Sequence, residues 1–265
     1  MKNFDYINYD LSEDSLSKLL DNKLGVIVVR NAVEDGVLSK LIEYFKFKNL
    51  ITSYDYSFNS NTVPEALHFM TTHYLYEEHR DQIEYLDAAK QSIDQLKQLE
   101  EFVNFNFGDF LYQCFQECSY KLERAKENDR EYSQMMVRSL KDGALLHADY
   151  APHLKEDWAI KKIRSELAWN IFIETPEAGG HTIIYDKQWV KSDDSHIIQD
   201  SYGYKEDLVD GCHSISYKPT RGDFVLFNSR NFHKVEPSFG KKDRITIGGH
   251  FGLKKGEDKT LIGWV

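Results

Sequence analysis

Apolar residues in the first half of the chain recur mostly with the spacing of helices. The pattern predicts a short helix in "LSEDSLSKLL", a buried strand over roughly 25–30, and a second helix through "GVLSKLIEYFKF". From about 77 to 128, apolar residues recur three and four positions apart with many charges between them, which is again typical of helices. The charged run "ERAKENDREYSQ" is expected to end this helical part as a solvated segment.

Residues 50–75 interrupt the helical pattern. They show no sustained period and are rich in Ser, Thr, Asn and aromatic residues. A loop of this length in a compact domain is often functional, so we expect it to cover an active site.

After Ser133 the pattern changes to short strands separated by Gly, Pro, Asp and Asn turns. The expected strands lie in "QMMVRSL", "ALLHADY", "ELAWNIFIE", "GHTIIYD", "HSISYK", "GDFVLF", "FHKVEP" and "RITIGGHFG". So many short strands favour a sandwich or jelly roll over alternating βαβ units. The polar segment 187–212 is expected as an insertion between two strands. We therefore expect one domain over 1–265: a mostly helical part (1–133), a jelly-roll core (134–252) and a C-terminal tail (253–265).

A possible metal site begins in "LLHADYAPH", residues 145–153. His147 and Asp149 have the H-x-D spacing with which a strand end and its loop offer two ligands to one metal ion. The best third ligand is His233, which follows the turn and apolar strand of "RGDFVLF". Distant strands lie side by side in an antiparallel jelly roll, so His233 can approach His147. Two imidazoles and one carboxylate are the facial triad of non-haem Fe(II) oxygenases.

Strand alternation places further polar residues inside the predicted barrel. In "RITIGGHFG", Arg244, Thr246 and His250 share one face, while the opposite face is apolar. A buried arginine is costly unless it meets an anion, and its planar fork suits a carboxylate, with the Thr246 hydroxyl beside it. In "ELAWNIFIE", Glu166 and Asn170 share the mixed face, so Asn170 is placed to bond a ligand.

The composition of the chain restricts the classes of partner that we expect the protein to bind. A formal net charge of −10 argues against nucleic acid as the main partner, although an acidic field would attract a basic small molecule. The N-terminus lacks a signal-peptide core and no run is long enough to span a bilayer, so we expect a cytoplasmic protein with no membrane partner. The spacing of Cys114 and Cys118 fits small buried residues on a helix better than a metal pair.

The order H-x-D, then Gly-Asp, strand and histidine, then Arg-x-Thr resembles the Fe(II)/2-oxoglutarate-dependent oxygenase superfamily. The resemblance covers residues 134–252 and, more loosely, "LGVIVVRNAV" with its flanking helices. It implies an α+β protein with a mainly β core, a double-stranded β-helix (jelly roll) whose N-terminal helices pack on the larger sheet. It implies Fe(II) and 2-oxoglutarate as cofactors, with O₂ as co-substrate. The implied iron ligands are His147, Asp149 and His233, and the implied cofactor-binding residues are Arg244 and Thr246. Strand alternation adds Asn170 to the expected cofactor-binding residues.

Within the superfamily, "SLKDGALLHADY" and "GGHTIIYDKQW" are similar to the group of free-lysine hydroxylases and radical amino-acid halogenases. Halogenases of that group replace the metal-binding carboxylate with a small residue, so Asp149 implies hydroxylation. The implied substrate is a small polar molecule, such as lysine or another basic amino acid. Its expected contacts are His250, Trp264, Tyr150 and Glu166, with Trp264 either closing over the substrate or pinning the C-terminus. The lysine-binding residues of the group are not reproduced in this sequence.

Two alternatives remain open from the sequence. One keeps the enzyme class but changes the substrate to a side chain of a peptide or protein, as in prolyl hydroxylases. The other is a non-catalytic jelly-roll sensor in which the metal is structural. In all of these, four further histidines are expected to stay outside the metal's ligand set: His153, His181, His213 and His250.

Overall fold

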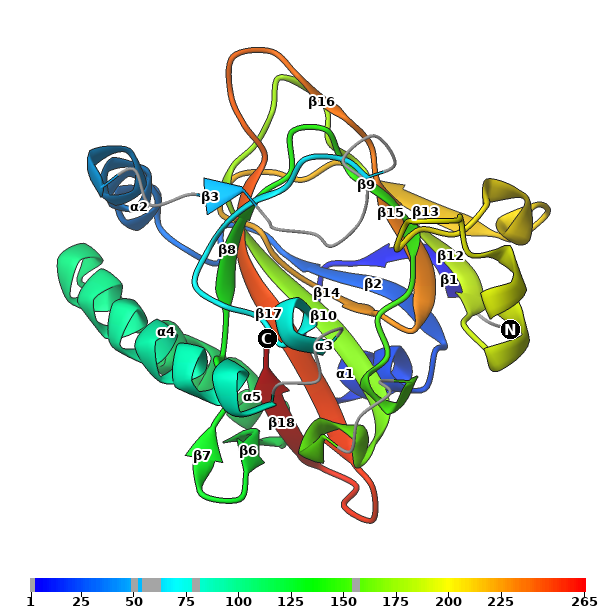
Figure 1. Cartoon of the computed structure of the whole chain (residues 1–265), viewed down its shortest axis with the longest axis horizontal. Helices are drawn as coiled ribbons and strands as arrows, with labels where there is room; N and C mark the ends of the chain where they lie inside the picture. Colours follow the sequence, from blue (N-terminus) through cyan, green and yellow to red (C-terminus); the bar gives the residue numbers. More distant parts are fainter. Residues whose placement is uncertain (1–2, 49–51, 54–62, 78–81, 154–157) are drawn as a thin grey trace.

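Two β-sheets facing each other form the centre of the protein in this computed structural model (Figure 1). The structure describes residues 3–48, 52–53, 63–77, 82–153 and 158–265. Side chains from the two inner faces pack together, for example Ala168 and Phe172 of the large sheet with Ile184 and Ile215 of the small one.

The large sheet has the strand order β1-β2-β14-β10-β17-β8-β4-β3, and β18 joins it between β17 and β5. The bounds are β1 Asn3–Asn8, β2 Leu24–Val29, β14 Phe224–Asn228, β10 Ile163–Glu174, β17 Ile245–Lys254, β8 Met136–Ser139, β4 Leu67–Phe69, β3 Thr52–Ser53, β18 Thr260–Trp264 and β5 Lys121–Arg124. Strand β17 is long enough to pair with β8 through its first half and with β18 through its second half.

The small sheet has the order β13-β12-β15-β9. Its strands are β13 Ser214–Tyr217, β12 Thr182–Gln188, β15 Asn231–Val235 and β9 Ala144–His147. Two short ribbons complete the β structure: β11 Ala178–Gly179 with β16 Ser238–Phe239, and β6 Lys126–Glu127 with β7 Arg130–Glu131. All eight strands expected after Ser133 are present, and the predicted mainly β core is confirmed.

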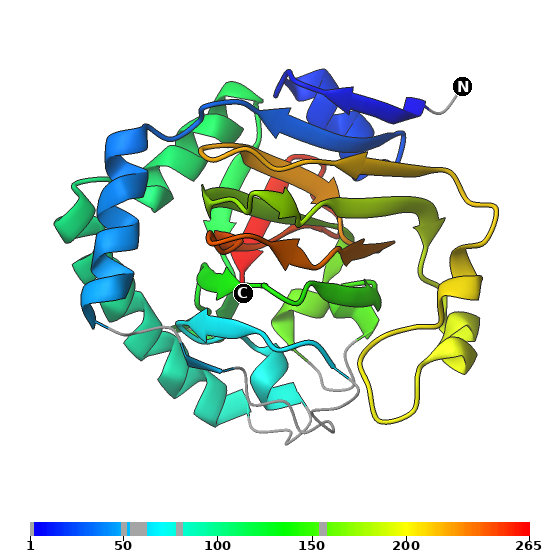
Figure 2. The same ribbon diagram turned by 90° about the horizontal axis from the view of Figure 1, so that it is seen from above.

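Helices cover the outer face of the large sheet (Figure 2). They are α1 Glu13–Leu20, α2 Asp35–Lys48, α4 Gln82–Val103 and α5 Phe107–Glu117. The short helix α3 Tyr74–Glu77 lies instead beside the cavity, with Tyr74 and Leu75 in its wall. Phe115 of α5 meets Phe251 of β17 edge to face, with ring centroids 4.6 Å apart. Ile247 and Phe251 pack in this layer, so the apolar face of β17 points out of the barrel, as the strand pattern predicted. No described helix is long and apolar enough to cross a membrane.

Four short 3₁₀ helices lie in the connections. They are η1 Ala151–His153, η2 Ala159–Lys161, η3 Lys191–His196 and η4 Glu206–Val209. The last two belong to the predicted 187–212 insertion, which packs Trp189 and Tyr204 against Phe232 of the small sheet.

The structure corrects four expectations about the elements. The helical region ends at Glu117, and "ERAKENDREYSQ" forms the end of β5 and the β6–β7 ribbon instead of an unstructured charge run. An ion pair joins the two strands of this ribbon, Lys126 of β6 with Glu131 of β7 at 3.4 Å. Strand β1 was not expected at all. Part of the expected loop 50–75 is β4, which pairs with β8, while residues 50–51 and 54–62 of that loop lie outside the described residues.

The fourth correction concerns the C-terminus. Residues 253–265 were expected to form a tail, but Thr260–Trp264 is strand β18 of the large sheet. Cys114 and Cys118 behave as expected, because both pack against the helical core. Burial raises the pKa of each thiol to about 11.

Candidate metal centre and cofactor pocket

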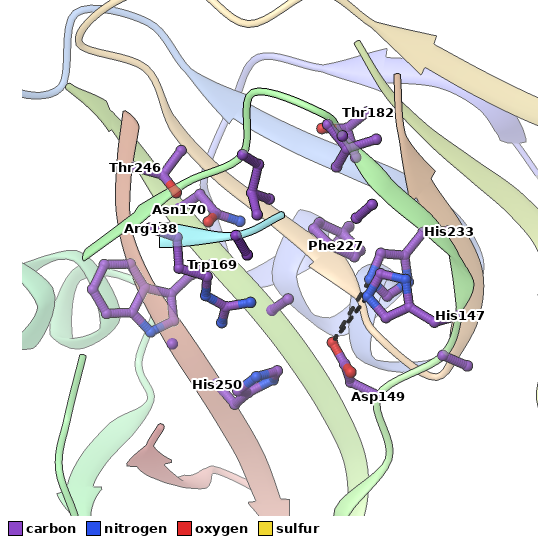
Figure 3. Close-up of a pocket in the computed structure, with 18 of the residues that line it drawn as sticks. Arg138, His147, Asp149, Trp169, Asn170, Thr182, Phe227, His233, Thr246 and His250 are labelled. Atoms are coloured by element: carbon purple, nitrogen blue, oxygen red, sulfur yellow. Dashed lines mark ion pairs between the residues drawn. The ribbon is translucent and has the colours of Figure 1, made fainter. Parts of the chain in front are cut away.

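The two histidines of the predicted triad face each other across the small sheet. His147 ends β9 and is the register partner of His233 in β15, and the two rings lie 4.2 Å apart (Figure 3). Gly143 makes this approach possible. Its φ is +83°, and a Cβ there would lie 2.3 Å from the carbonyl oxygen of Val235, so only glycine fits the turn that leads β9 onto β15.

Both imidazoles are oriented by backbone carbonyls. Nδ1 of His147 lies 2.7 Å from the carbonyl oxygen of Leu145, and Nδ1 of His233 lies 2.9 Å from that of Asn231. A carbonyl can only accept, so each Nδ1 carries the hydrogen. The Nε2 lone pair of both rings is then available to a metal, which is the arrangement found around metal-binding histidines.

Asp149 completes the group from the loop after β9. Its backbone N–H donates to the carbonyl of Ser229 at 2.9 Å, which fixes the loop beside the β14–β15 turn. One oxygen, Oδ2, lies 3.9 Å from Nε2 of His147 and 3.7 Å from Nε2 of His233. These separations are too long for hydrogen bonds but fit donors that share an ion about 2.0–2.2 Å from each. In the described part of the chain this is the only group of three such ligands found, with all donor atoms within 4.8 Å of one another.

The electrostatics keep Asp149 and His233 in their ligand forms. Burial, with repulsion from His147, lowers the pKa of His233 to about 3, so its imidazole is neutral at physiological pH. For Asp149, burial alone would raise the pKa, but the nearby imidazoles and Arg138 outweigh it and hold the pKa well below its usual range. The site therefore presents the carboxylate of Asp149 and the neutral imidazole of His233, the forms in which these side chains bind a metal.

The triad opens into a cavity of about 350 Å³ between the two sheets. This is a size typical of small-molecule sites. Its wall includes Ala168, Asn170 and Phe172 of β10, so the predicted mixed face of this strand does line a pocket.

Arg244 lies in the cavity wall immediately before β17 and is 3% exposed. Its Nε donates to the carbonyl of Gly180 at 3.3 Å and its Nη2 to the hydroxyl of Thr182 at 3.1 Å, while the guanidinium stacks over Phe172. Burial lowers its pKa to about 10, which leaves it charged at neutral pH. Within the described ranges no carboxylate pairs with it, so a buried cation remains for an anionic ligand to neutralise.

A second hydroxyl lies beside Arg244. Thr246, expected to help Arg244 bind the carboxylate, is buried and lines the cavity, while the hydroxyl that accepts from Arg244 belongs to Thr182 on β12. Sequence analysis did not identify Thr182. The structure shows that Ile184 of β12 pairs with His233 of β15. Thr182 lies two residues from Ile184, so both point to the same inner face.

The candidate substrate contacts fall into two groups. Tyr150 and His250 line the cavity. Glu166 lies behind His250 and is fully buried, with Oε1 3.1 Å from Nδ1 of His250 and Oε2 accepting from the N–H of Ala151 at 2.6 Å. Glu166 is therefore placed to orient His250, not to touch a ligand in the cavity.

Trp264 does not reach the cavity wall. It is fully buried in β18, opposite His250 in the strand register, and its indole stacks on that imidazole with centroids 5.9 Å apart. The interpretation of Trp264 as a cover over substrate is thus wrong. Its backbone is held between β17 and β5, which leaves it in the sheet behind His250.

His153 and His181 have partners other than the triad, although His153 also lines the cavity. The ring of His153 stacks on Trp189 at 3.9 Å, and Nδ1 of His181 lies 2.9 Å from Glu236. Arg138 of β8, by contrast, lines the cavity and was missed. The available signal was a charged residue in the otherwise apolar strand "QMMVRSL".

Comparisons with known proteins give a family model that matches most of the chain and several similar proteins. A family model described as the carrier-protein-independent halogenase WelO5 matches residues 3–262. Leucinostatins biosynthesis cluster protein S of Purpureocillium lilacinum is 38% identical over 42% of this chain and 46% of its own length. L-gamma-glutamyl-L-propargylglycine hydroxylase of Streptantibioticus cattleyicolor is 28% identical over 49% of this chain and 47% of its own. The chain thus aligns with about half the length of these relatives.

Among solved structures, an N-substituted L-amino acid dioxygenase from Burkholderia ambifaria has the same fold. It matches with a TM-score of 0.64 and 14% identity, covering 96% of this chain and 91% of that one, and it has also been solved with 2-oxoglutarate. The epimerase SnoN in complex with Fe³⁺ and 2-oxoglutarate matches with a TM-score of 0.50 and 8% identity, over 92% and 87% of the two chains.

The family model, the fold and the candidate metal site are consistent with one superfamily. The superfamily's cofactors are iron and 2-oxoglutarate, and the His-Asp-His triad described above is able to bind the metal. The chain belongs to the family of the carrier-protein-independent halogenase WelO5, within the Fe(II)/2-oxoglutarate-dependent oxygenase superfamily.

Proposed function

We propose that the protein is a 2-oxoglutarate-dependent dioxygenase that hydroxylates an unactivated C–H bond of a small amino-acid-type molecule. The observation that carries the proposal is a complete triad, with its carboxylate, in the wall of the same cavity as the buried cation of Arg244. A structural metal site would not need a buried arginine without a carboxylate partner beside it.

Each group has a role that follows from its position. His147, Asp149 and His233 would hold Fe(II) on one face, leaving the other face for ligands. Arg244, held by Thr182, would bind the distal carboxylate of 2-oxoglutarate through its planar fork. When bound, iron and 2-oxoglutarate together with O₂ supply the oxidation of the C–H bond and release succinate and CO₂. The protein orients the reactants and excludes water, so no side-chain acid or base is assigned.

Asp149 favours hydroxylation over halogenation. The radical halogenases that this sequence resembles carry a small residue at the corresponding position, which leaves room at the metal for a halide. Here a carboxylate fills that position and points at both histidines. Halogenation remains the second candidate, because the matching family model describes a halogenase.

Relatives support an amino-acid-type substrate. The names of two similar proteins specify a γ-glutamyl amino acid and an N-substituted amino acid. The sequence favoured a basic substrate, but the described cavity wall gives this no support. Its only carboxylate is Asp149, which would be occupied by the metal.

The test is turnover with a product assay. The protein is incubated with Fe(II), 2-oxoglutarate, O₂ and chloride, against free and N-substituted amino acids, and succinate and product masses are measured. Succinate formed together with a product heavier by one oxygen atom supports the proposal, and a chlorinated product identifies a halogenase. Absence of succinate in every mixture would overturn both. His181→Ala should retain the activity of the unaltered protein, because this histidine lies outside the triad in a partly exposed ion pair.

A further inference from the structure

Arg138 brings a second cation to the cavity. It lies on β8 as the register partner of Thr246 and lines the cavity wall. Its guanidinium lies at the same end of the cavity as His250, across from Asp149 (Figure 3). Neither a salt bridge nor a hydrogen bond joins Arg138 to a carboxylate within the described ranges, although ordered arginines near a protein interior are normally paired.

The two arginines lie in different parts of the cavity. Arg244 contacts Gly180 and Thr182 at the small sheet, whereas Arg138 is near enough to Asp149 and His250 to influence the triad. Arg138 and Arg244 also repel each other, which adds to the cost of holding both in one cavity. One 2-oxoglutarate molecule can neutralise the cation of Arg244 with its distal carboxylate while its keto acid end reaches the metal. Arg138 is then without an anionic partner.

The sum of the charges in the cavity also favours a substrate that carries a carboxylate. With a divalent metal, the two arginines and the metal carry four positive charges. Asp149 and 2-oxoglutarate carry three negative charges, so one positive charge remains in the cavity outside the buried Glu166–His250 pair. A substrate carboxylate would balance it. The described wall offers no further carboxylate for a substrate ammonium group.

A buried histidine lies beside Arg138. His250 is 1% exposed, lines the cavity, and its Nε2 has no hydrogen-bond partner among the described residues. Glu166 and Trp264 fix this ring from behind. A buried nitrogen held toward a cavity without a partner is costly unless a ligand bonds to it.

We infer that Arg138 anchors the carboxylate of the organic substrate, with His250 beside it, and that the substrate class is amino acids whose nitrogen is acylated or otherwise uncharged. This inference rests on the proposed function and names the substrate class of the same site. A bidentate guanidinium–carboxylate pair would fix the substrate's orientation relative to the metal. A free zwitterionic amino acid would bring an ammonium group into a cavity that already has excess positive charge.

The experiment measures binding without turnover. The protein is loaded with Zn(II) and 2-oxoglutarate, and saturation-transfer NMR is recorded with N-acetyl L-amino acids, their C-terminal carboxamides and the free amino acids. At least one N-acetyl acid should bind at least about tenfold more tightly than its carboxamide and its free amino acid, since hydrogen bonds to a charged group contribute about 1.5–3 kcal/mol. This comparison uses the unaltered protein and does not depend on how a variant folds.

Variants assign the effect to the residue. Arg138→Gln should remove the preference for the acid over the carboxamide and change 2-oxoglutarate affinity by less than about twofold, while Arg138→Lys should retain part of the preference. Arg164→Gln is the matched control, because Arg164 is a partly exposed arginine of β10 that is 3.7 Å from Asp258 and absent from the cavity wall.

Three results would overturn the inference. Carboxamides could bind as well as acids, Arg138→Gln could weaken 2-oxoglutarate instead of the acid, or no acid could bind although 2-oxoglutarate does. In the last case the proposed function would survive and only the substrate class would fail. Failure of 2-oxoglutarate itself to bind would overturn both.

Discussion

His147 and His233 are direct partners across neighbouring antiparallel strands, and their imidazoles lie 4.2 Å apart. Two of the three candidate metal ligands are thus fixed by backbone pairing before any metal binds. A shift of one residue in the β9–β15 register would turn one of the rings to the opposite face of the sheet. The turn at Gly143 and the carbonyls that hold each Nδ1 protect this register and ring orientation.

Removing a ligand should separate metal binding from folding. We expect His233→Ala to lose stoichiometric binding of Fe(II) or Mn(II), measured by calorimetry or metal analysis after dialysis. The unfolding transition should remain cooperative, because the apolar clusters that hold the two sheets and the helices together do not include this imidazole. His181→Ala should bind one metal ion as the unaltered protein does. Full metal occupancy in His233→Ala would contradict the assignment of this ligand.

Arg244 should control affinity for 2-oxoglutarate and not for metal. Arg244→Lys keeps the charge but loses the fork, so the dissociation constant for 2-oxoglutarate should rise by about 10- to 100-fold, equivalent to about 1.5–3 kcal/mol for hydrogen bonds to a charged group. Thr182→Val should also weaken binding, because the hydroxyl that positions the guanidinium is removed.

Fluorescence or calorimetric titration with metal present measures both effects. Thr246→Val is the informative comparison, since Thr246 lines the cavity without a described bond to Arg244. An unchanged dissociation constant in Arg244→Lys would show that the distal carboxylate binds elsewhere.

Trp264 should matter for stability. It is fully buried in β18, so Trp264→Ala should lower the free energy of unfolding by about 3–5 kcal/mol, the usual cost of deleting a buried aromatic side chain. Urea unfolding measures this. Tyr112→Ala is the control, because that ring is 49% exposed and its loss should change stability by less than about 0.5 kcal/mol. An equal, small change in both variants would argue against the position of β18.

Glu166 should act through its two buried neighbours. Glu166→Ala leaves the N–H of Ala151 without its acceptor and His250 without its neighbouring carboxylate, so stability should fall by about 1–3 kcal/mol or more. Glu166→Gln retains an oxygen for the Ala151 N–H and should lose less. Urea unfolding of the two variants compares them, and equal losses would mean that the carboxamide cannot replace this acceptor.

The candidate metal and cofactor residues His147, Asp149 and Arg244 were predictable because their signals are local in sequence. H-x-D spacing brings His147 and Asp149 together whatever the rest of the fold does, and strand alternation places Arg244 inside the barrel. Asn170 followed from the same alternation in β10, and it does line the cavity.

The missed features depend on pairing between distant segments. Thr182 meets Arg244 only through the register of β12 with β15. Strand β5 was hidden in a charged stretch that looks like a surface helix, and without β5 nothing indicated that "LIGWV" would be a sheet strand. Arg138 was visible as a charge in an apolar strand, but its meaning came from the cavity that it lines.

The most direct test of the central claim is anaerobic titration of Fe(II) into the protein with 2-oxoglutarate, followed by visible absorption. Chelation of ferrous iron by the keto acid gives a charge-transfer band that needs no substrate. We predict a band that saturates at one equivalent of Fe(II), disappears in His147→Ala and His233→Ala, and needs more 2-oxoglutarate in Arg244→Lys. The absence of a band in the unaltered protein, or a band of full strength in both histidine variants, would contradict the account.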